Sequence, residues 1–265
     1  MRFRAHALVT FCCVSLLACA AVVRAEDPPA APADPATPAQ SEIVKAEIAK
    51  VEAVKLAASK SQSTAKPGAL AVDAVVKSID AQITKLAVNK SDAAWRTKLA
   101  LPTVAKFDPA KSYFAHMLTN KGEMVIKFKP DVAPMHVTNF IYLARMGYYD
   151  GLKFHRVIKG FMAQGGDPLG NGGGGPGYKF AGEFSPKALH NAAGVLSTAN
   201  SGPGTDGSQF FIMFSAYPSL DGRYSIFGQV EQGLDTLKKL EAAGNPGDGG
   251  PTEPLNITKV TIEVR

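Results

Sequence analysis

Two stretches in the first 100 residues repeat apolar side chains at the three- and four-residue spacing of a helix that buries one face. The first stretch covers 41–59 and Ser41 can cap its start. The second follows a break at Lys66-Pro67-Gly68. The apolar positions are Val44, Ile48, Val51 and Val54 in the first stretch, and Val72, Val75, Val76, Ile79, Ile83 and Leu86 in the second. Residues 41–100 are therefore predicted to form a helical segment, most simply a hairpin of two helices.

The helical segment carries no chemically distinctive group, so its pattern leaves several roles open. It could dock on the rest of the molecule, pair with a second copy of the chain, grip a client polypeptide, or act as a spacer that covers part of a domain surface. Self-association through 41–100 is therefore one of the partner hypotheses.

From about Phe107, short alternating runs are separated by Gly, Pro and Asn, which is typical of strands and tight turns. Strands are predicted at Tyr113–Leu118, Met124–Phe128, Phe154–Ile158, Phe161–Gln164, Val195–Ala199, Phe210–Phe214, Tyr224–Val230 and Ile257–Val264. Helices are predicted at Pro134–Met146 and Glu231–Ala243, each followed by a glycine. Many short strands with few helices predict a mainly β domain over 107–265, either a sandwich or a closed barrel.

The first 25 residues have the pattern of a signal peptide. Arg2 and Arg4 precede an uncharged stretch over 7–23, and Val23-Arg24-Ala25 places small residues where signal peptidase reads the chain. Cleavage after Ala25 would release an exported protein. A bacterial periplasm is the expected destination, and the lumen of a eukaryotic secretory pathway is the alternative.

The three cysteines all lie in this segment, and one of them opens an alternative to cleavage. Cys19 follows Leu16-Leu17-Ala18, a passable lipobox, so a lipid could attach there. The stretch could also remain uncleaved as a membrane anchor. Contact with a membrane is expected only in those two cases. Cleavage at Ala25 would leave a chain without thiols, which suits an oxidising compartment and excludes disulfides and cysteine nucleophiles.

Residues 26–40 are rich in Pro and Ala, which predicts an extended, semi-stiff linker. The net charge of the chain is +6, and it falls to +3 when the three arginines of the first 25 residues are set aside. So mild a charge argues against a nucleic-acid partner.

The run that begins at Phe154 is the first place where the pattern indicates chemistry. Alternate residues of a strand share a face, so Arg156 lies beside Phe154. After a turn at Lys159, Met162 lies beside Gln164 for the same reason. A cation, an amide and an apolar side chain can therefore gather on one side of a hairpin. By themselves these three residues favour an ordinary hairpin with a surface arginine.

Three further runs follow in series. They are Leu196-Ser197-Thr198-Ala199-Asn200-Ser201-Gly202-Pro203, Gly207-Ser208-Gln209-Phe210-Phe211-Ile212 and Leu220-Asp221-Gly222-Arg223-Tyr224-Ser225-Ile226-Phe227-Gly228. Together with the hairpin run they closely resemble the cyclophilin family of peptidyl-prolyl cis/trans isomerases, over about 107–265. Several long motifs that agree in order and spacing make this resemblance specific, whereas one short match would mean little.

The resemblance implies a closed eight-stranded antiparallel barrel with a helix capping each end. It also implies a site on the outside of the barrel that binds an extended Xaa-Pro segment and catalyses its cis/trans isomerisation. The expected partners are proline-containing unfolded or partly folded polypeptides, here exported ones. No metal ion and no cofactor is expected.

Site residues carry over from the family one by one. Arg156 resembles the catalytic arginine, Gln164 the glutamine that works beside it, and His155 the histidine next to the arginine. The residues that match the apolar pocket for the proline ring are Phe161, Met162, Phe211 and Leu220. The edge that holds the substrate backbone matches Ala199, Asn200 and Ser201, and Tyr224 lies at the pocket rim.

Two positions depart from the family's pattern. Ser219 stands where a Trp is common, which puts tight binding of cyclosporin in doubt, because that indole often donates a hydrogen bond to the drug. Tyr224 stands where a His is common. A phenol offers similar apolar area and a donor, so we expect altered tuning of the site and retained activity.

Proline isomerisation suits these residue types. Rotation about a peptide bond has a barrier of about 18–20 kcal/mol because the nitrogen lone pair is shared with the carbonyl, and no bond has to break. A guanidinium stays charged and offers several donors. Arg156 can therefore donate more strongly as the amide twists and its nitrogen becomes basic, which lowers the barrier without a nucleophile or a metal.

Two alternatives come from other classes of protein. The run Gly170 to Gly175 formally matches a dinucleotide-binding loop, but Pro176 follows it, so no helix start is available for a pyrophosphate, and a loop of the β domain is expected instead. The second alternative is a non-catalytic chaperone or scaffold that only binds proline segments. Arg156 argues against it, because binding alone does not require that residue.

Overall fold

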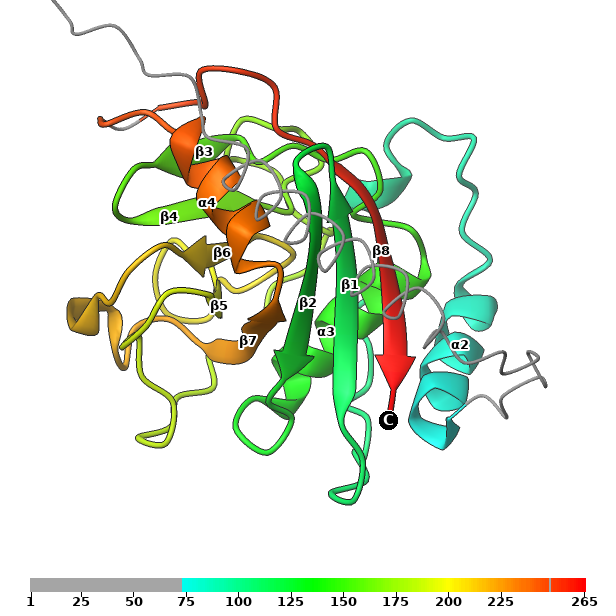
Figure 1. The fold of residues 1–265 in the computed structure, drawn as a ribbon. Helices are drawn as coiled ribbons and strands as arrows, with labels where there is room; N and C mark the ends of the chain where they lie inside the picture. The colour runs from blue at the N-terminus through cyan, green and yellow to red at the C-terminus, as the bar shows by residue number, and fades with distance from the viewer. Residues whose placement is uncertain (1–72, 248) are drawn as a thin grey trace, which may run out of the picture. The chain divides into compact units, whose positions relative to one another are not determined.

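The computed structural model describes residues 73–247 and 249–265, so the predicted signal peptide, the linker and the first predicted helix lie outside the described residues. Eight strands form one antiparallel sheet in the order β3-β4-β6-β5-β7-β2-β1-β8. The strands are β1 (Tyr113–Thr119), β2 (Gly122–Phe128), β3 (Arg156–Ile158), β4 (Met162–Gly165), β5 (Val195–Thr198), β6 (Phe210–Met213), β7 (Ile226–Gln232) and β8 (Ile257–Val264). Figure 1 shows β8 beside β1 and, at the other end of the sheet, β3 beside β4.

The described residues contain three α-helices: α2 (Ala74–Leu86), α3 (Pro134–Arg145) and α4 (Leu234–Ala242). Two short 3-10 helices, η1 (Trp95–Thr97) and η2 (Pro218–Leu220), lie in the connections. The helices α3 and α4 are the two helices predicted for the β domain, and Pro134 occupies the first turn of α3, where its missing N–H costs nothing.

The sheet curls into a half-barrel, which corrects the closed barrel expected from the resemblance. Within the described residues, β3 and β8 are the two ends of the strand order and share no ladder. The loop after α4 takes the edge of β3 instead: Asn245 donates to the Val157 carbonyl at 2.9 Å, and Val157 donates to the Gly249 carbonyl at 3.3 Å. On the side away from β1, the chain at the start of β8 pairs with the residues before β3: Lys153 bridges Asn256, and Ile257 donates to the Leu152 carbonyl at 2.8 Å.

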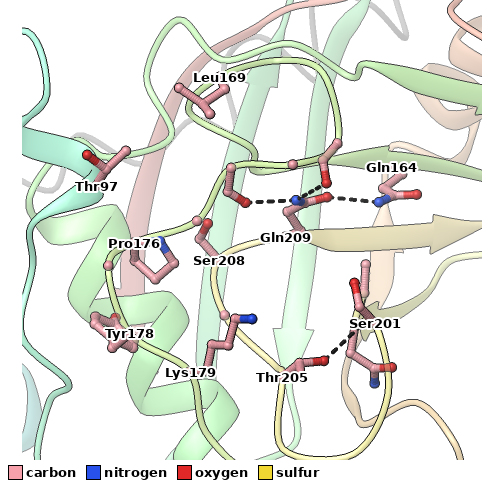
Figure 2. A pocket seen from close by; sticks show the side chains of 18 residues that line it. Thr97, Gln164, Leu169, Pro176, Tyr178, Lys179, Ser201, Thr205, Ser208 and Gln209 are labelled. Carbon is pink, nitrogen blue, oxygen red and sulfur yellow. Dashed lines mark hydrogen bonds between the residues drawn. The ribbon is translucent and has the colours of Figure 1, made fainter.

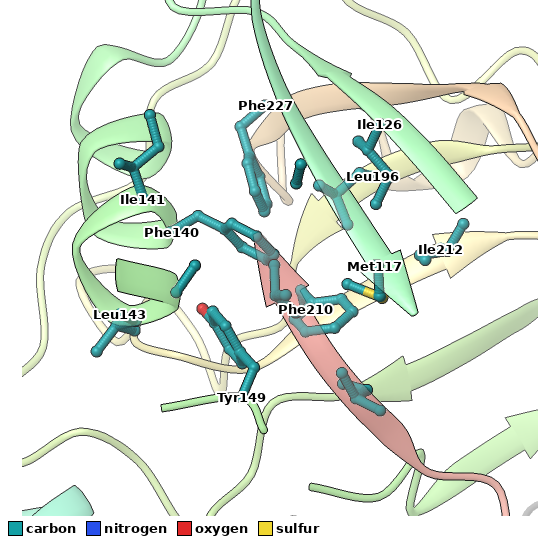
Figure 3. Packing of buried hydrophobic residues seen from close by; sticks show 14 of the residues in the cluster. Met117, Ile126, Phe140, Ile141, Leu143, Tyr149, Leu196, Phe210, Ile212 and Phe227 are labelled. Atoms are coloured by element: carbon teal, nitrogen blue, oxygen red, sulfur yellow. The ribbon is translucent and has the colours of Figure 1, made fainter. Parts of the chain in front are cut away.

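The main hydrophobic core lies between α3 and the sheet (Figure 3). Phe140 of α3 stacks on Tyr149 with ring centroids 4.6 Å apart and meets the edge of Phe210 at 5.6 Å. All three rings are almost completely removed from solvent. Aromatic contacts of this kind add about 0.5–1.5 kcal/mol each beyond the burial of apolar area, so they stabilise the packing of α3 on the sheet.

Helix α2 docks on the β domain through α3. Asp73 caps its start by accepting the backbone N–H of Val75 at 2.8 Å. Ile79 is completely buried in the main core, and Asp80 accepts two hydrogen bonds from Arg145 of α3, at 2.9 and 2.7 Å. The described part of the helical segment therefore packs on α3 and contributes Ile79 to the main core. No α-helix in the described part of the chain has the length and apolar run needed to cross a bilayer.

Candidate active site

A second apolar cluster, separate from the main core, brings together six of the eight predicted substrate-binding residues. Its buried members are Met162, Ala188, Val195, Phe211, Met213 and Ile226. The predicted residues at its partly exposed edge are Phe161, Ala199, Leu220 and Tyr224. We refer to these ten residues as the site cluster. An apolar surface that is only partly covered can bury an apolar group of a ligand.

Strand pairing explains why the site cluster forms. On the paired strands β4 and β6, Met162 lies opposite Met213 and Gln164 lies opposite Phe211. Because alternate residues of a strand share a face, these side chains point away from the main core. The rings of Tyr224 and Phe211 meet edge to face, with their centroids 5.5 Å apart and their planes at 82°. The cluster therefore has a wall of aromatic rings beside a floor of methionines.

Arg156, Gln164 and Gln209 form a hydrogen-bonded line along one side of the site cluster. Arg156 on β3 lies opposite Gln164 on β4, and its Nη1 donates to Gln164 Oε1 at 3.3 Å. Gln164 Nε2 donates to Gln209 Oε1 at 2.9 Å. Gln209 Nε2 in turn donates to the carbonyls of Gly172 and Gly174, both at 2.8 Å (Figure 2). Because each amide is fixed at both ends, the Gln164 carbonyl faces the guanidinium.

A cavity of about 700 Å³ opens beside this line. Gln164 and Gln209 line one side of it, the glycine run 172–175 another, and the predicted backbone edge Ala199–Ser201 a third. Asn200 Nδ2 donates to the Arg223 carbonyl at 3.2 Å, which ties this edge to the connection that carries Tyr224. The cavity and the site cluster are therefore adjoining parts of one groove.

His155 is a predicted site residue that belongs neither to the site cluster nor to the lining of the cavity. Its side chain leaves the strand on the side opposite to Arg156. A Cβ atom placed on Gly172 would lie 3.7 Å from its Nε2, so the ring lies against the glycine run. Neither ring nitrogen has a hydrogen-bond partner among the described residues, and burial lowers the pKa of His155. A catalytic role for this histidine stays a prediction.

His190 is a supporting residue that sequence reasoning missed. It is completely buried and its ring stacks on Phe211, with centroids 6.0 Å apart and planes at 18°. Its Nδ1 lies 2.8 Å from Asp221 Oδ1 and its Nε2 lies 2.7 Å from Ser197 Oγ. Burial lowers the pKa of His190, although Asp221 opposes this effect. A neutral ring therefore donates to the carboxylate and accepts from the hydroxyl, and it fixes the floor of the site cluster.

Gln209 was also missed, although it lies in one of the quoted motifs, because its sequence position gives no sign that it bridges Gln164 to the glycine run. The described residues contain no group of three or more His, Cys, Asp and Glu side chains that could hold a metal ion. The groups that line the site include a guanidinium, two side-chain amides and an apolar surface.

Known proteins share this domain. The family model described as "Cyclophilin type peptidyl-prolyl cis-trans isomerase/CLD" matches residues 114–262. Peptidyl-prolyl cis-trans isomerase B of Streptomyces anulatus is 44% identical over 174 residues, which cover 59% of this chain and 99% of that protein. Peptidyl-prolyl cis-trans isomerase CYP18-1 of Arabidopsis thaliana is 47% identical over 148 residues, which cover 54% of this chain and 92% of that protein.

Some relatives are much longer, and this chain spans only 30% of the length of a peptidyl-prolyl cis-trans isomerase-like 2 of Cryptococcus neoformans, to which it is 43% identical over 171 residues. The crystal structure of a cyclophilin-type isomerase from Cryptosporidium parvum matches with a TM-score of 0.55 and 36% identity, over 57% of this chain and 98% of that one. A second structure of that protein was determined in the presence of the dipeptide Ala-Pro. With a family model that covers more than half of its residues, the chain belongs to the cyclophilin-type peptidyl-prolyl cis-trans isomerases.

Proposed function

We propose that this chain accelerates cis/trans isomerisation of Xaa-Pro bonds in polypeptides, with Arg156 as the group that stabilises the twisted amide. The observation that carries the proposal is the position of Arg156, hydrogen-bonded to Gln164 at the side of the site cluster. A proline ring buried in that cluster would place its imide nitrogen next to the guanidinium. No other charged side chain among the described residues combines these two features.

Each part of the groove has a separate task in this mechanism. Burial of most of the proline ring in the site cluster would contribute about 2 kcal/mol to binding. Arg156 donates to the amide group as the nitrogen lone pair is released from resonance, so it stabilises the transition state more than either ground state. An acceleration of about 10⁵ requires roughly 7 kcal/mol, which is within reach of several preorganised contacts.

Gln164 and Gln209 keep the guanidinium in place. Since Gln164 Oε1 accepts a hydrogen bond from Arg156, and Gln209 fixes the Gln164 amide, the cation need not reorganise during the reaction. Preorganisation of this kind is worth most in a groove that is partly closed to water.

The proposal also places the reaction outside the cytoplasm, on exported clients and in a bacterial periplasm. The support is the signal-like pattern of residues 1–25 and the lack of cysteine after Cys19. Expression of the full chain in a bacterium, followed by mass analysis of its N-terminus, tests this. A start at Glu26 supports export with cleavage, a lipid on Cys19 supports a lipoprotein, and an intact cytoplasmic chain contradicts both.

The decisive experiment measures kcat/KM for a short Ala-Pro-Phe peptide with the wild type, Arg156→Ala and Arg156→Lys. We expect Arg156→Ala to lose about 10²–10³-fold, the cost of one preorganised donor, and Arg156→Lys to recover little because an ammonium lacks the planar fork. Arg145→Ala is the matched control, because that arginine pairs with Asp80 on α2, outside the groove. Wild type without catalysis would favour a chaperone or scaffold that only binds proline segments, and unchanged activity in Arg156→Ala would refute the mechanism.

A further inference from the structure

The segment Trp95–Leu99 precedes the residues that the family model matches, yet it lies directly against the wall of the cavity. Leu99 donates its backbone N–H to the Pro176 carbonyl at 2.9 Å. Gly177 has a φ of +99°, and a Cβ atom there would lie only 2.5 Å from the Thr97 carbonyl oxygen. The two backbones therefore touch with no room for a side chain between them. Figure 2 shows Thr97 and Pro176 on the same side of the cavity.

The segment is itself anchored to the turn that follows α3. Arg96 donates from Nε to the Tyr148 carbonyl at 2.8 Å and from Nη2 to the Asp150 carbonyl at 2.9 Å. Trp95 is only 8% exposed, and its ring meets the Tyr148 ring edge-on with centroids 6.1 Å apart. Two directed hydrogen bonds and a buried indole make the position of this segment well defined.

The contacted wall is the loop 170–177, which we call the glycine loop. It is held from within by Asp167, whose carboxylate accepts the backbone N–H groups of Leu169 at 2.8 Å, Asn171 at 2.9 Å and Gly172 at 2.6 Å. Burial acts to raise the pKa of Asp167, but these donors hold it below its usual value, so the carboxylate is ionised.

The glycine loop is also hydrogen-bonded to the line of side chains formed by Arg156, Gln164 and Gln209. Gln209 donates to the carbonyls of Gly172 and Gly174 and accepts from Gln164, which accepts from Arg156. A displacement of the loop would therefore move two of the groups that Gln209 binds and change the shape of the cavity at the same time.

We propose that Trp95–Leu99 is a positioning segment of the peptide-binding groove. It sets the location of the glycine loop and thereby determines how well residues on either side of the substrate's proline fit the cavity. This inference rests on the proposed isomerase function and adds to it a specificity element outside residues 114–262.

The test uses the full chain and two substrates, a blocked Ala-Pro dipeptide and a peptide extended by three residues on each side of the same pair. We expect Gly177→Ala to lower the ratio of kcat/KM for the extended peptide to that for the dipeptide about tenfold, because only the extended peptide depends on the fit of its flanking residues to the cavity. Arg96→Ala should lower the ratio about threefold, and Arg96→Lys should lie between Arg96→Ala and wild type, because an ammonium can reach one of the two carbonyls.

Gly151→Ala is the matched control, since Gly151 has a similar φ of +79° and a Cβ atom there would meet nothing within 4 Å among the described residues. It carries the same backbone strain without the clash, so its ratio should equal that of the wild type. A second readout needs no turnover. The side-chain amide signals of Gln209 in the NMR spectrum should shift in Gly177→Ala and Arg96→Ala and stay in place in Gly151→Ala.

The proposal requires both a lower ratio of kcat/KM and a shift of the Gln209 side-chain signals. A ratio within twofold of wild type in Gly177→Ala and Arg96→Ala, or Gln209 signals that do not move, would overturn it. So would an equal loss on both peptides, because that is the result of a merely structural contact. A wild type that isomerises neither peptide refutes the proposed function instead, and the Gln209 signals then decide whether the segment positions the loop.

Discussion

The main core and the site cluster are built from the same strands, yet only the main core is fully covered by other parts of the fold. Along β4 and β6, Ala163 and Ile212 enter the main core, whereas Met162, Phe211 and Met213 enter the site cluster. The alternation of side chains across a strand thus produces two apolar environments from one sequence run. Helix α3 covers the first, but the second keeps a partly exposed edge. The difference shows where the molecule is stabilised and where it can bind a ligand.

The largest effect on folding stability should follow from removing a side chain of the main core. Phe140→Ala would remove the ring that contacts Tyr149 and Phe210, and it would leave a cavity under α3. Substitutions of this kind cost about 3–5 kcal/mol, so the free energy of unfolding in urea should fall by that amount. The kcat/KM of the molecules that remain folded should stay near wild type. A comparable loss of activity per folded molecule would mean that the two environments are coupled.

The second prediction concerns His190, which supports the floor of the site cluster. His190→Ala would leave the buried Ser197 hydroxyl without its partner and the Asp221 carboxylate with the backbone N–H of residue 190 alone, and it would remove the ring stacked on Phe211. Unpaired buried polar groups cost about 1–3 kcal/mol in the free energy of unfolding. Because the floor of the site cluster loosens as well, KM for an extended proline peptide should rise. His190→Gln, which can still donate and accept, should recover part of both losses, and no recovery would argue against the proposed bonding.

A smaller effect should separate binding from stability. Phe161 lies at the edge of the site cluster, where its ring is 4.6 Å from that of the exposed Tyr217. Phe161→Ala should lower kcat/KM about tenfold, which corresponds to about 1.4 kcal/mol, because the proline ring loses one wall. The free energy of unfolding should change by less than that. A stability loss as large as that of Phe140→Ala would show that this edge is part of the core.

Much of this arrangement could be predicted from local patterns. The period-two runs locate the strands, and Pro134 and Gly147 bound α3 within a residue or two. The alternation of side chains on either side of the Lys159 turn placed Arg156 and Gln164 on one side of a hairpin, and β3 and β4 pair with these two residues opposite each other. These features depend on neighbours in sequence or on one hairpin, which a single sequence states directly.

The remaining features depend on contacts between distant segments. The closed barrel was wrong because Asn245 and Gly249 take the edge of β3, and no pattern in 245–249 announces this pairing. His190 and Gln209 were missed because their partners lie 7–45 residues away along the chain. The contact of Leu99 with Pro176 is of the same kind. Polar groups that support a site leave no periodic signal, since each needs only one well-placed partner.

The smallest expected effect is the pH dependence of folding stability that arises from two buried histidines, His136 and His190. His136 on α3 lies with Nδ1 2.6 Å from Glu183 Oε2 and Nε2 2.8 Å from Asp206 Oδ2, and Ser225 Oγ also donates to Asp206 at 3.3 Å. Burial acts to lower the pKa of His136, but the two carboxylates hold it above its ordinary value. For His190, burial dominates and the pKa is lowered.

The two pKa shifts predict that the histidines' contributions to folding stability change in opposite directions with pH. Between about 6.5 and its raised folded pKa, His136 binds a proton in the native state only, so its stabilising contribution is complete below about pH 6.5 and is lost as the pH rises through the folded pKa. His190 behaves in reverse, because its contribution is present above about pH 6.5 and is lost as the pH falls toward its lowered folded pKa. Urea unfolding of wild type, His136→Gln and His190→Gln at pH 5.5, 7.0 and 8.5 measures both. The advantage of wild type over His136→Gln should shrink with rising pH and that over His190→Gln should shrink with falling pH, and two slopes of the same sign would show that one of these histidines is held in the opposite charge state.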